Sequence, residues 1–128
     1  MKKIIFFILF SFLLQSWQCS RDSIYSQTKI ITSDELKIKK QAIINYISSF
    51  NCTTGCNYIA LGSKPCGGPW EYIAYPSNVN ETILTEMVEE YNQMEYNYNI
   101  QNELISDCSM VMPPNEVNCV NGICKIIN

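Results

Sequence analysis

Hydrophobic residues recur at the three- and four-residue spacing of an amphipathic helix in two stretches of the chain. The first is residues 33–50, whose apolar face would comprise Leu36, Ile43, Ile47 and Phe50. Thr32 precedes this stretch and Glu35 follows three residues later, a combination that forms a capping box at a helix N-terminus. The pattern predicts a helix of about five turns that packs through its apolar face.

The second helical stretch, residues 81–99, follows Asn80, a residue preferred at the N-cap. Its predicted apolar face contains Leu84, Met87, Val88, Tyr91, Met94 and Tyr98. Its predicted outer face contains Glu86, Glu89, Glu90, Asn92 and Gln93. We therefore expect a second amphipathic helix of about five turns.

Shorter apolar, aromatic and β-branched runs predict strands between and after the helices. These runs are residues 58–61, 70–75, 109–112, 117–120 and 123–127. An order of one helix, two strands, one helix and three strands is typical of an α+β domain. The expected fold is a small antiparallel sheet of about four to five strands, packed with two helices and cross-linked by disulfides.

The last two runs are joined by Asn121-Gly122, the sequence that most strongly favours a two-residue type I′ hairpin. In such a hairpin, Cys119 and Cys124 lie directly opposite each other at a non-hydrogen-bonded position. The Cα atoms at such a position are about 4.5 Å apart, which is within reach of a disulfide. A local Cys119–Cys124 bridge is one hypothesis, and bridges from each cysteine to the core are the other.

The first residues have the three parts of a secretory signal peptide: two lysines, an apolar run over residues 4–14 and polar residues after it. The apolar run is too short to cross a bilayer, which takes about 20 apolar residues. We therefore expect a signal peptide over residues 1–19, a flexible polar tether over 20–32 and a single disulfide-rich domain over 33–128.

Cys19 follows the apolar run at the distance at which bacterial lipoprotein signals place their lipid-modified cysteine. That resemblance implies cleavage before Cys19 and attachment to a membrane through a lipid. Lipoprotein signals carry small residues just before this cysteine, whereas this chain has Ser16-Trp17-Gln18. Ordinary cleavage nearby, giving a secreted protein, is the alternative.

Cysteine usage supports an oxidising compartment outside the cytoplasm. The chain has seven cysteines, and six remain after Cys19 is set aside: Cys52, Cys56, Cys66, Cys108, Cys119 and Cys124. An even number in a short exported chain predicts three disulfides, which six cysteines can form in 15 ways.

The charges are unevenly distributed. After residue 19, seven basic residues face twelve acidic ones, a net charge of −5, and residues 65–124 contain nine acids and no Lys or Arg. Such a field repels phosphates, so nucleic acids and anionic membrane surfaces are poor partners. A cationic partner or simple solubility is the better interpretation.

The sequence offers little for catalysis. The absence of histidine removes the most common general base and the usual partner of a Ser or Cys nucleophile. The cysteine spacings match no zinc pattern and no calcium loop is present, so we expect neither a metal nor another cofactor. Glu86 and Glu90 are four residues apart, but they are expected on the solvated helix face.

Two segments are candidates for contact with a partner. Cys66-Gly67-Gly68-Pro69-Trp70 is either a turn pinned by a disulfide, with Trp70 in the core, or a binding loop. The first interpretation is favoured.

The second candidate segment contains Met112, Pro113 and Pro114 between two cysteines. It is either a plain connection between strands or a stiff exposed loop of the kind that inhibitors insert into a protease cleft.

The chain resembles a group of small, cysteine-rich bacterial envelope proteins to which no activity is attached. The resemblance rests on residues 62–70, Glu89-Glu90-Tyr91-Asn92, Ser106-Asp107-Cys108, Pro113-Pro114 and the terminal Cys-x4-Cys. It implies export and a disulfide-bonded domain. The leading hypothesis is a lipid-anchored, non-enzymatic binding or structural module, with an unknown protein or envelope component as partner. The alternative is a secreted inhibitor of a protease or other hydrolase.

Overall fold

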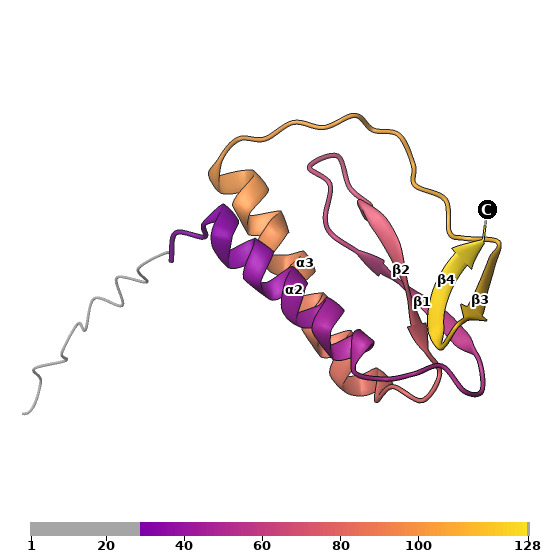
Figure 1. The fold of residues 1–128 in the computed structure, drawn as a ribbon. Helices are drawn as coiled ribbons and strands as arrows, with labels where there is room; N and C mark the ends of the chain where they lie inside the picture. The colour runs from indigo at the N-terminus through magenta and orange to yellow at the C-terminus, as the bar shows by residue number, and fades with distance from the viewer. Residues whose placement is uncertain (1–28, 128) are drawn as a thin grey trace, which may run out of the picture.

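A computed structural model describes residues 29–127 of the chain (Figure 1). The predicted signal peptide, Cys19 and most of the predicted tether lie outside these residues. The described part has an α+β fold with two helices and two antiparallel hairpins. Its elements are α2 (Ser33–Ser48), β1 (Cys56–Leu61), β2 (Glu71–Pro76), α3 (Glu81–Gln101), β3 (Glu116–Val120) and β4 (Ile123–Ile127).

Helix α2 begins as its sequence predicts. The Thr32 hydroxyl accepts a hydrogen bond from the Glu35 amide, and the Glu35 carboxylate accepts one from the Thr32 amide, so both halves of the capping box are present. Leu36 and Ile43 are buried on its inner face. The helix ends at Ser48, two residues before the predicted end.

Helix α3 begins after Asn80, whose side chain accepts a hydrogen bond from the Ile83 amide. It ends two residues later than predicted, with a Schellman motif. In this motif the Glu103 amide donates to the Ile100 carbonyl and the Leu104 amide donates to the Asn99 carbonyl. Glu103 has the left-handed backbone conformation (φ 50°) that usually favours glycine.

The two helices lie antiparallel and side by side against the β1–β2 hairpin (Figure 1). Gln101 at the end of α3 bonds to Ile31 before α2, and the Tyr46 hydroxyl near the end of α2 donates to the Asn80 carbonyl before α3. Between these ends, Lys39 of α2 pairs with Glu90 of α3. Within residues 29–127, neither helix has a stretch long and apolar enough to cross a membrane.

The hydrophobic core lies between the helices and the first hairpin. It consists of Leu36, Ile43, Leu61, Tyr75, Val79, Leu84, Val88 and Tyr91. The apolar faces predicted for both helices therefore supply most of it. Residues 29–32, the last part of the predicted tether, lie against α3 through the bonds between Ile31 and Gln101.

The predicted single sheet of four to five strands is not confirmed. Strand β1 pairs with β2, strand β3 pairs with β4, and no hydrogen-bonded ladder joins the two hairpins. The strand predicted over residues 109–112 is wrong, because this segment has no strand pairing. Its Ser109 carbonyl accepts a hydrogen bond from the Lys64 side chain, and Pro113 and Pro114 lack the amide hydrogen that a ladder needs.

The C-terminal hairpin has the predicted turn and register. Asn121 and Gly122 have φ of 54° and 78°, as a type I′ turn requires, and Cys119 lies opposite Cys124.

The local Cys119–Cys124 bridge, however, is wrong. Cys119 is bonded to Cys52 and Cys124 to Cys56, with Cα–Cα distances of 5.9 and 5.7 Å. Directly opposite residues point to the same face of a hairpin, and here both side chains meet the segment that holds Cys52 and Cys56. These bridges attach the hairpin to the rest of the domain, which a local bridge would not do.

We expect the core to tolerate little loss of volume. Leu84 is fully buried, whereas its neighbour Ile83 is 44% exposed. Leu84→Ala should lower the free energy of unfolding by about 2–5 kcal/mol, and Ile83→Ala should change it by about 0.5 kcal/mol or less. Urea unfolding of the oxidised variants measures both values, and equal effects would contradict the packing described.

Candidate binding site

Two segments far apart in the sequence meet at a third disulfide. Cys66, in the loop between β1 and β2, is bonded to Cys108, in the segment between α3 and β3, with a Cα–Cα distance of 5.4 Å. Beside this bridge is a hollow of about 420 Å³, which we call the disulfide-linked cleft. It is lined by Cys66, Gly67, Gly68, Pro69, Tyr72, Cys108, Ser109, Met110, Val111, Met112 and Pro113.

The structure thus brings together most of the residues proposed for partner binding. Gly67, Gly68 and Pro69 line one side of the disulfide-linked cleft, and Met112 and Pro113 line the other. Trp70 and Pro114 belong to the same two segments but do not line the cleft. The sequence indicated each segment separately, and it did not indicate that they form one site.

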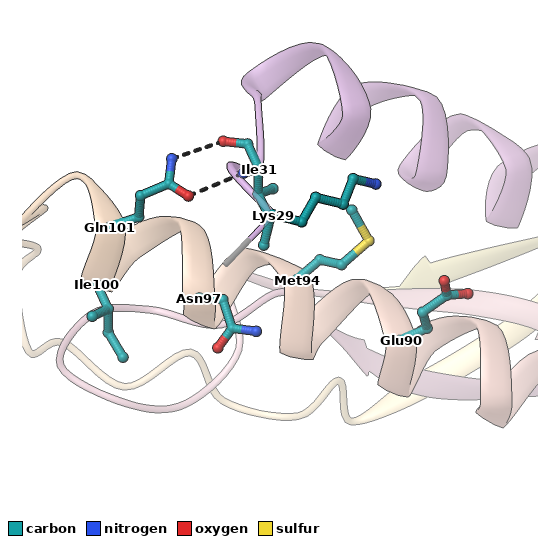
Figure 2. A pocket seen from close by; sticks show the side chains of 7 residues that line it. All are labelled: Lys29, Ile31, Glu90, Met94, Asn97, Ile100 and Gln101. Atoms are coloured by element: carbon teal, nitrogen blue, oxygen red, sulfur yellow. Dashed lines mark hydrogen bonds between the residues drawn. The ribbon is translucent and has the colours of Figure 1, made fainter. Parts of the chain in front are cut away.

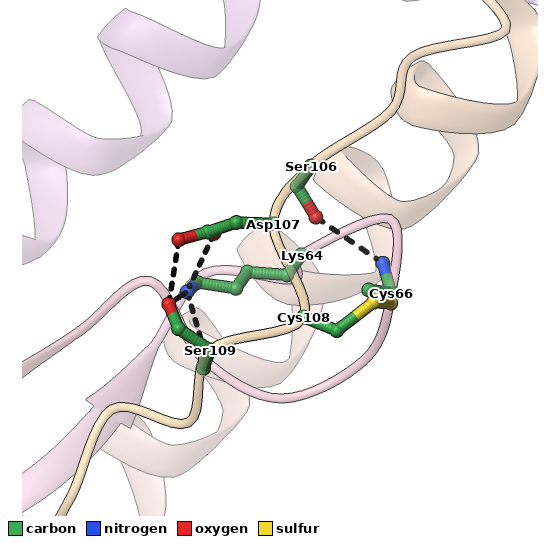
Figure 3. The surroundings of a disulfide bond; sticks show 6 residues. All are labelled: Lys64, Cys66, Ser106, Asp107, Cys108 and Ser109. Atoms are coloured by element: carbon green, nitrogen blue, oxygen red, sulfur yellow. Dashed lines mark hydrogen bonds and ion pairs between the residues drawn. A yellow bond between two sulfur atoms is a disulfide. The ribbon is translucent and has the colours of Figure 1, made fainter.

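A buried lysine joins the same two segments (Figure 3). Lys64 is only 5% exposed. Its ammonium group donates to the Ser109 carbonyl at 2.9 Å and lies 3.4 Å from the Asp107 carboxylate. It also lies 5.1 Å from the centre of the Trp70 ring, a cation–π distance. Lys64 therefore positions the start of the methionine-containing segment.

Asp107 is held in its charged form by this arrangement. The hydrogen bond from the Ser109 hydroxyl, at 2.6 Å, is the largest cause that lowers the pKa of Asp107, and contact with the Lys64 ammonium lowers it further. A second link across the segments is the bond from the Cys66 amide to the Ser106 hydroxyl, at 3.4 Å.

Polar side chains of α3 fix the first residues of the β1–β2 loop. The Gly62 amide donates to Asn92 at 2.6 Å and the Ser63 amide donates to Glu95 at 2.6 Å. The buried Asn99 side chain donates to the Ser63 carbonyl at 2.6 Å. The prediction that Asn92 lies on the outer face is therefore wrong, because its amide group satisfies the loop backbone.

Trp70 packs at the base of this loop. Gly62 has φ of 91°, and a Cβ at this position would approach Trp70 and Glu95 to 2.8 and 2.9 Å, so only glycine fits. The expected placement of Trp70 in the core is wrong. Trp70 is 43% exposed, although one edge of its ring faces Gly62 and the Lys64 ammonium lies over the ring.

The methionines of the other segment are among the most exposed apolar side chains. Met110 is 84% exposed and Met112 is 71% exposed, although both line the cleft. Exposed apolar groups beside a rigid, disulfide-linked loop are typical of a surface that contacts another molecule.

The remaining predicted chemical groups lie elsewhere. Glu86 and Glu90 are exposed on α3 as expected, and Glu90 is paired with Lys39. In the described part of the chain, one cluster has sulfurs near enough to share a metal: Cys52, Cys56 and Cys124, within 4.8 Å of one another. All three are in disulfides, so they have no thiolate to offer as a ligand.

Sequence reasoning missed three residues that build the site: Lys64, Glu95 and Asn99. Lys64 did leave a signal in the sequence. It is the last basic residue before residues 65–124, which contain nine acidic residues and no Lys or Arg. Asn99 and Glu95 left none, since their role depends on which face of α3 meets the loop.

The three disulfides indicate an oxidising environment outside the cytoplasm. Comparisons with protein-family models, curated proteins and solved structures find no match to this chain.

Acid should loosen the contact between the two segments of the cleft. The pKa of Asp107 is lower in the fold than its ordinary value of 3.8, so its contacts stabilise the fold above that pH and are lost as the pH falls through the folded-state pKa. Trp70 is the only tryptophan after residue 19, and its ring is in contact with the Lys64 ammonium, so its fluorescence reports the change.

We expect a fluorescence transition below about pH 4 that disappears in Asp107→Asn. Asp34→Asn, at an exposed position on α2, is the control and should leave the transition unchanged. A transition that persists in Asp107→Asn would show that another group causes it.

Proposed function

We propose that this protein is an exported, lipid-anchored, non-enzymatic binding module of the cell envelope. The signal segment predicted over residues 1–19 is cleaved just before Cys19, and Cys19 then carries the lipid. The pattern of the first residues and the three disulfides support export. Its partner is a protein or another envelope component, which it binds through the disulfide-linked cleft and the exposed side chains around it.

One observation carries this proposal: the Cys66–Cys108 disulfide and the Lys64 side chain link the β1–β2 loop to the segment that follows α3. A disulfide and a buried ammonium group keep the loop and the methionine-containing segment in one arrangement before any partner arrives. Such preorganisation reduces the conformational entropy lost on binding. Met110 and Met112 then offer flexible, polarisable surface at the rim.

The lining of the cleft favours binding over catalysis. It contains glycines, prolines, methionines, a valine, a serine, a tyrosine and a disulfide, and no carboxylate, lysine or free thiol. A general acid or base must lie within hydrogen-bond reach of its substrate. Asp107 and Lys64 lie nearby, but each is engaged by the other and by Ser109.

Photo-crosslinking in the native host tests the proposed surface. A photoreactive amino acid at Met112 should give a discrete adduct, because this side chain is exposed at the rim of the cleft. The matched control is Ile38, which is 69% exposed on α2, and it should give none. The adduct should also be lost when Cys66 and Cys108 are both changed to Ala. Equal labelling at both positions, or none at Met112, would contradict the proposal.

One observation favours the alternative of a secreted hydrolase inhibitor. The segment from Cys108 to Pro114 has no helix or strand, is held at one end by the disulfide, and presents Met110 almost completely to solvent. A fixed and exposed segment of this kind can occupy a protease cleft.

A panel of envelope and secreted proteases distinguishes inhibition from binding without inhibition. An inhibitor should give stoichiometric loss of activity of one protease, and Met110→Gly should weaken the inhibition on the order of tenfold or more. Ile123→Gly, at an exposed position on β4, is the control and should have no effect. If no protease is inhibited, the alternative is wrong.

A further inference from the structure

Exposed apolar side chains gather at the end of the molecule where the N-terminal segment meets the end of α3. We call this group the apolar tip: Ile30, Ile100, Leu104 and Ile105. Their exposed fractions are 73%, 60%, 44% and 94%. Beside them is an open hollow of about 650 Å³, to which Ile31, Met94 and Ile100 contribute (Figure 2).

Two sets of hydrogen bonds fix the apolar tip. Gln101 accepts from the Ile31 amide and donates to the Ile31 carbonyl, both at 3.0 Å, so the segment that precedes α2 is held against the end of α3 (Figure 2). On the other side, the Schellman motif holds Leu104, whose amide donates to the Asn99 carbonyl at 3.0 Å. Leu104 and Ile100 line a common hollow, and Ile105 follows directly.

The chain outside the structure joins the domain at this tip. Nine residues lie between Cys19 and Lys29, so an anchor at Cys19 lies within about 40 Å of Ile30 even when this segment is fully extended. Tethering at such a distance keeps a surface at a high effective concentration near the tip. A contact that is too weak to bind an untethered protein to this surface is then sufficient to keep the tip on it.

We infer that the apolar tip docks on the lipid surface in which the chain is anchored, with Ile105 and Leu104 inserted at the level of the headgroups. This inference rests on the proposed lipid anchor and adds an orientation to it. The charged residues next to tip residues in the sequence, Lys29 and Glu103, are of opposite sign. The attraction is therefore apolar, and neutral lipids suffice.

Docking in this way turns the β3–β4 hairpin away from the membrane. Ile123 of β4 lies near Ser48, at the opposite end of α2 from Ile30, because both line one hollow. Since α2 has 16 residues, these two ends are about 24 Å apart. Ile123 is 62% exposed, so it is a matched apolar control for Ile105.

The test uses residues 20–128 with a hexahistidine tag in place of Cys19, bound to phosphatidylcholine vesicles that contain a nickel-chelating lipid. An environment-sensitive fluorescent amino acid replaces Ile105 in one sample and Ile123 in another. Only the probe at 105 should shift its emission to the blue and be quenched by nitroxide-labelled lipid. Adding Ile100→Ser and Leu104→Ser should abolish the shift.

Two results would overturn docking on lipid. One is a probe at 105 that is unshifted, or shifted no more than the probe at 123, on the vesicles. The other is a shift at 105 that appears without lipid and grows with protein concentration, which would assign the tip to a second copy of the chain.

The artificial tether separates this test from the test of lipidation. The intact mass of the protein from its host reports the state of Cys19. An unmodified Cys19 with a lipid-dependent shift at 105 would remove the anchor of the proposed function and support the tip as a lipid-binding surface.

Discussion

The last quarter of the described chain is held mainly by disulfides. Every side chain in residues 102–127 is at least partly exposed, so this region has no hydrophobic core of its own. Yet it contributes one side of the cleft and the whole second hairpin. Bridges that close loops of 42 to 68 residues stabilise a fold by about 4 kcal/mol each in the chain-entropy model. The second bridge to the hairpin adds less, because the first already brings its ends together.

Local sequence rules predicted the elements well where one chemical feature decides the backbone. The Thr32–Glu35 capping box, the Asn80 cap and the Asn121-Gly122 turn all appear as expected. Partition of the strands into two hairpins was not predictable, because it depends on where α3 directs the chain. The same holds for disulfide connectivity, since opposite cysteines on a hairpin can bond to each other or to a common neighbour.

The site was predictable as two segments and not as one surface. Glycines, prolines and methionines mark each segment, but their meeting depends on Cys66–Cys108 and on Lys64, which link residues about 40 positions apart. Trp70 and Asn92 were misplaced for a related reason. By residue type, a large aromatic ring is assigned to the core and a polar helical residue to solvent. Here the missing side chain of Gly62 leaves room for the Trp70 ring, and the Gly62 amide donates a hydrogen bond to Asn92.

The connectivity of the cysteines has a consequence for how the chain matures. Each of the first three cysteines, Cys52, Cys56 and Cys66, is bonded to one of the last three. A polypeptide that enters an oxidising compartment from its N-terminus therefore presents three thiols before any correct partner has arrived. Of these three, Cys52 and Cys56 are the closest in sequence, so a non-native disulfide between them is the nearest one available. Completion of the native set has to await Cys108, Cys119 and Cys124, and a thiol–disulfide isomerase would act on molecules that had paired too early.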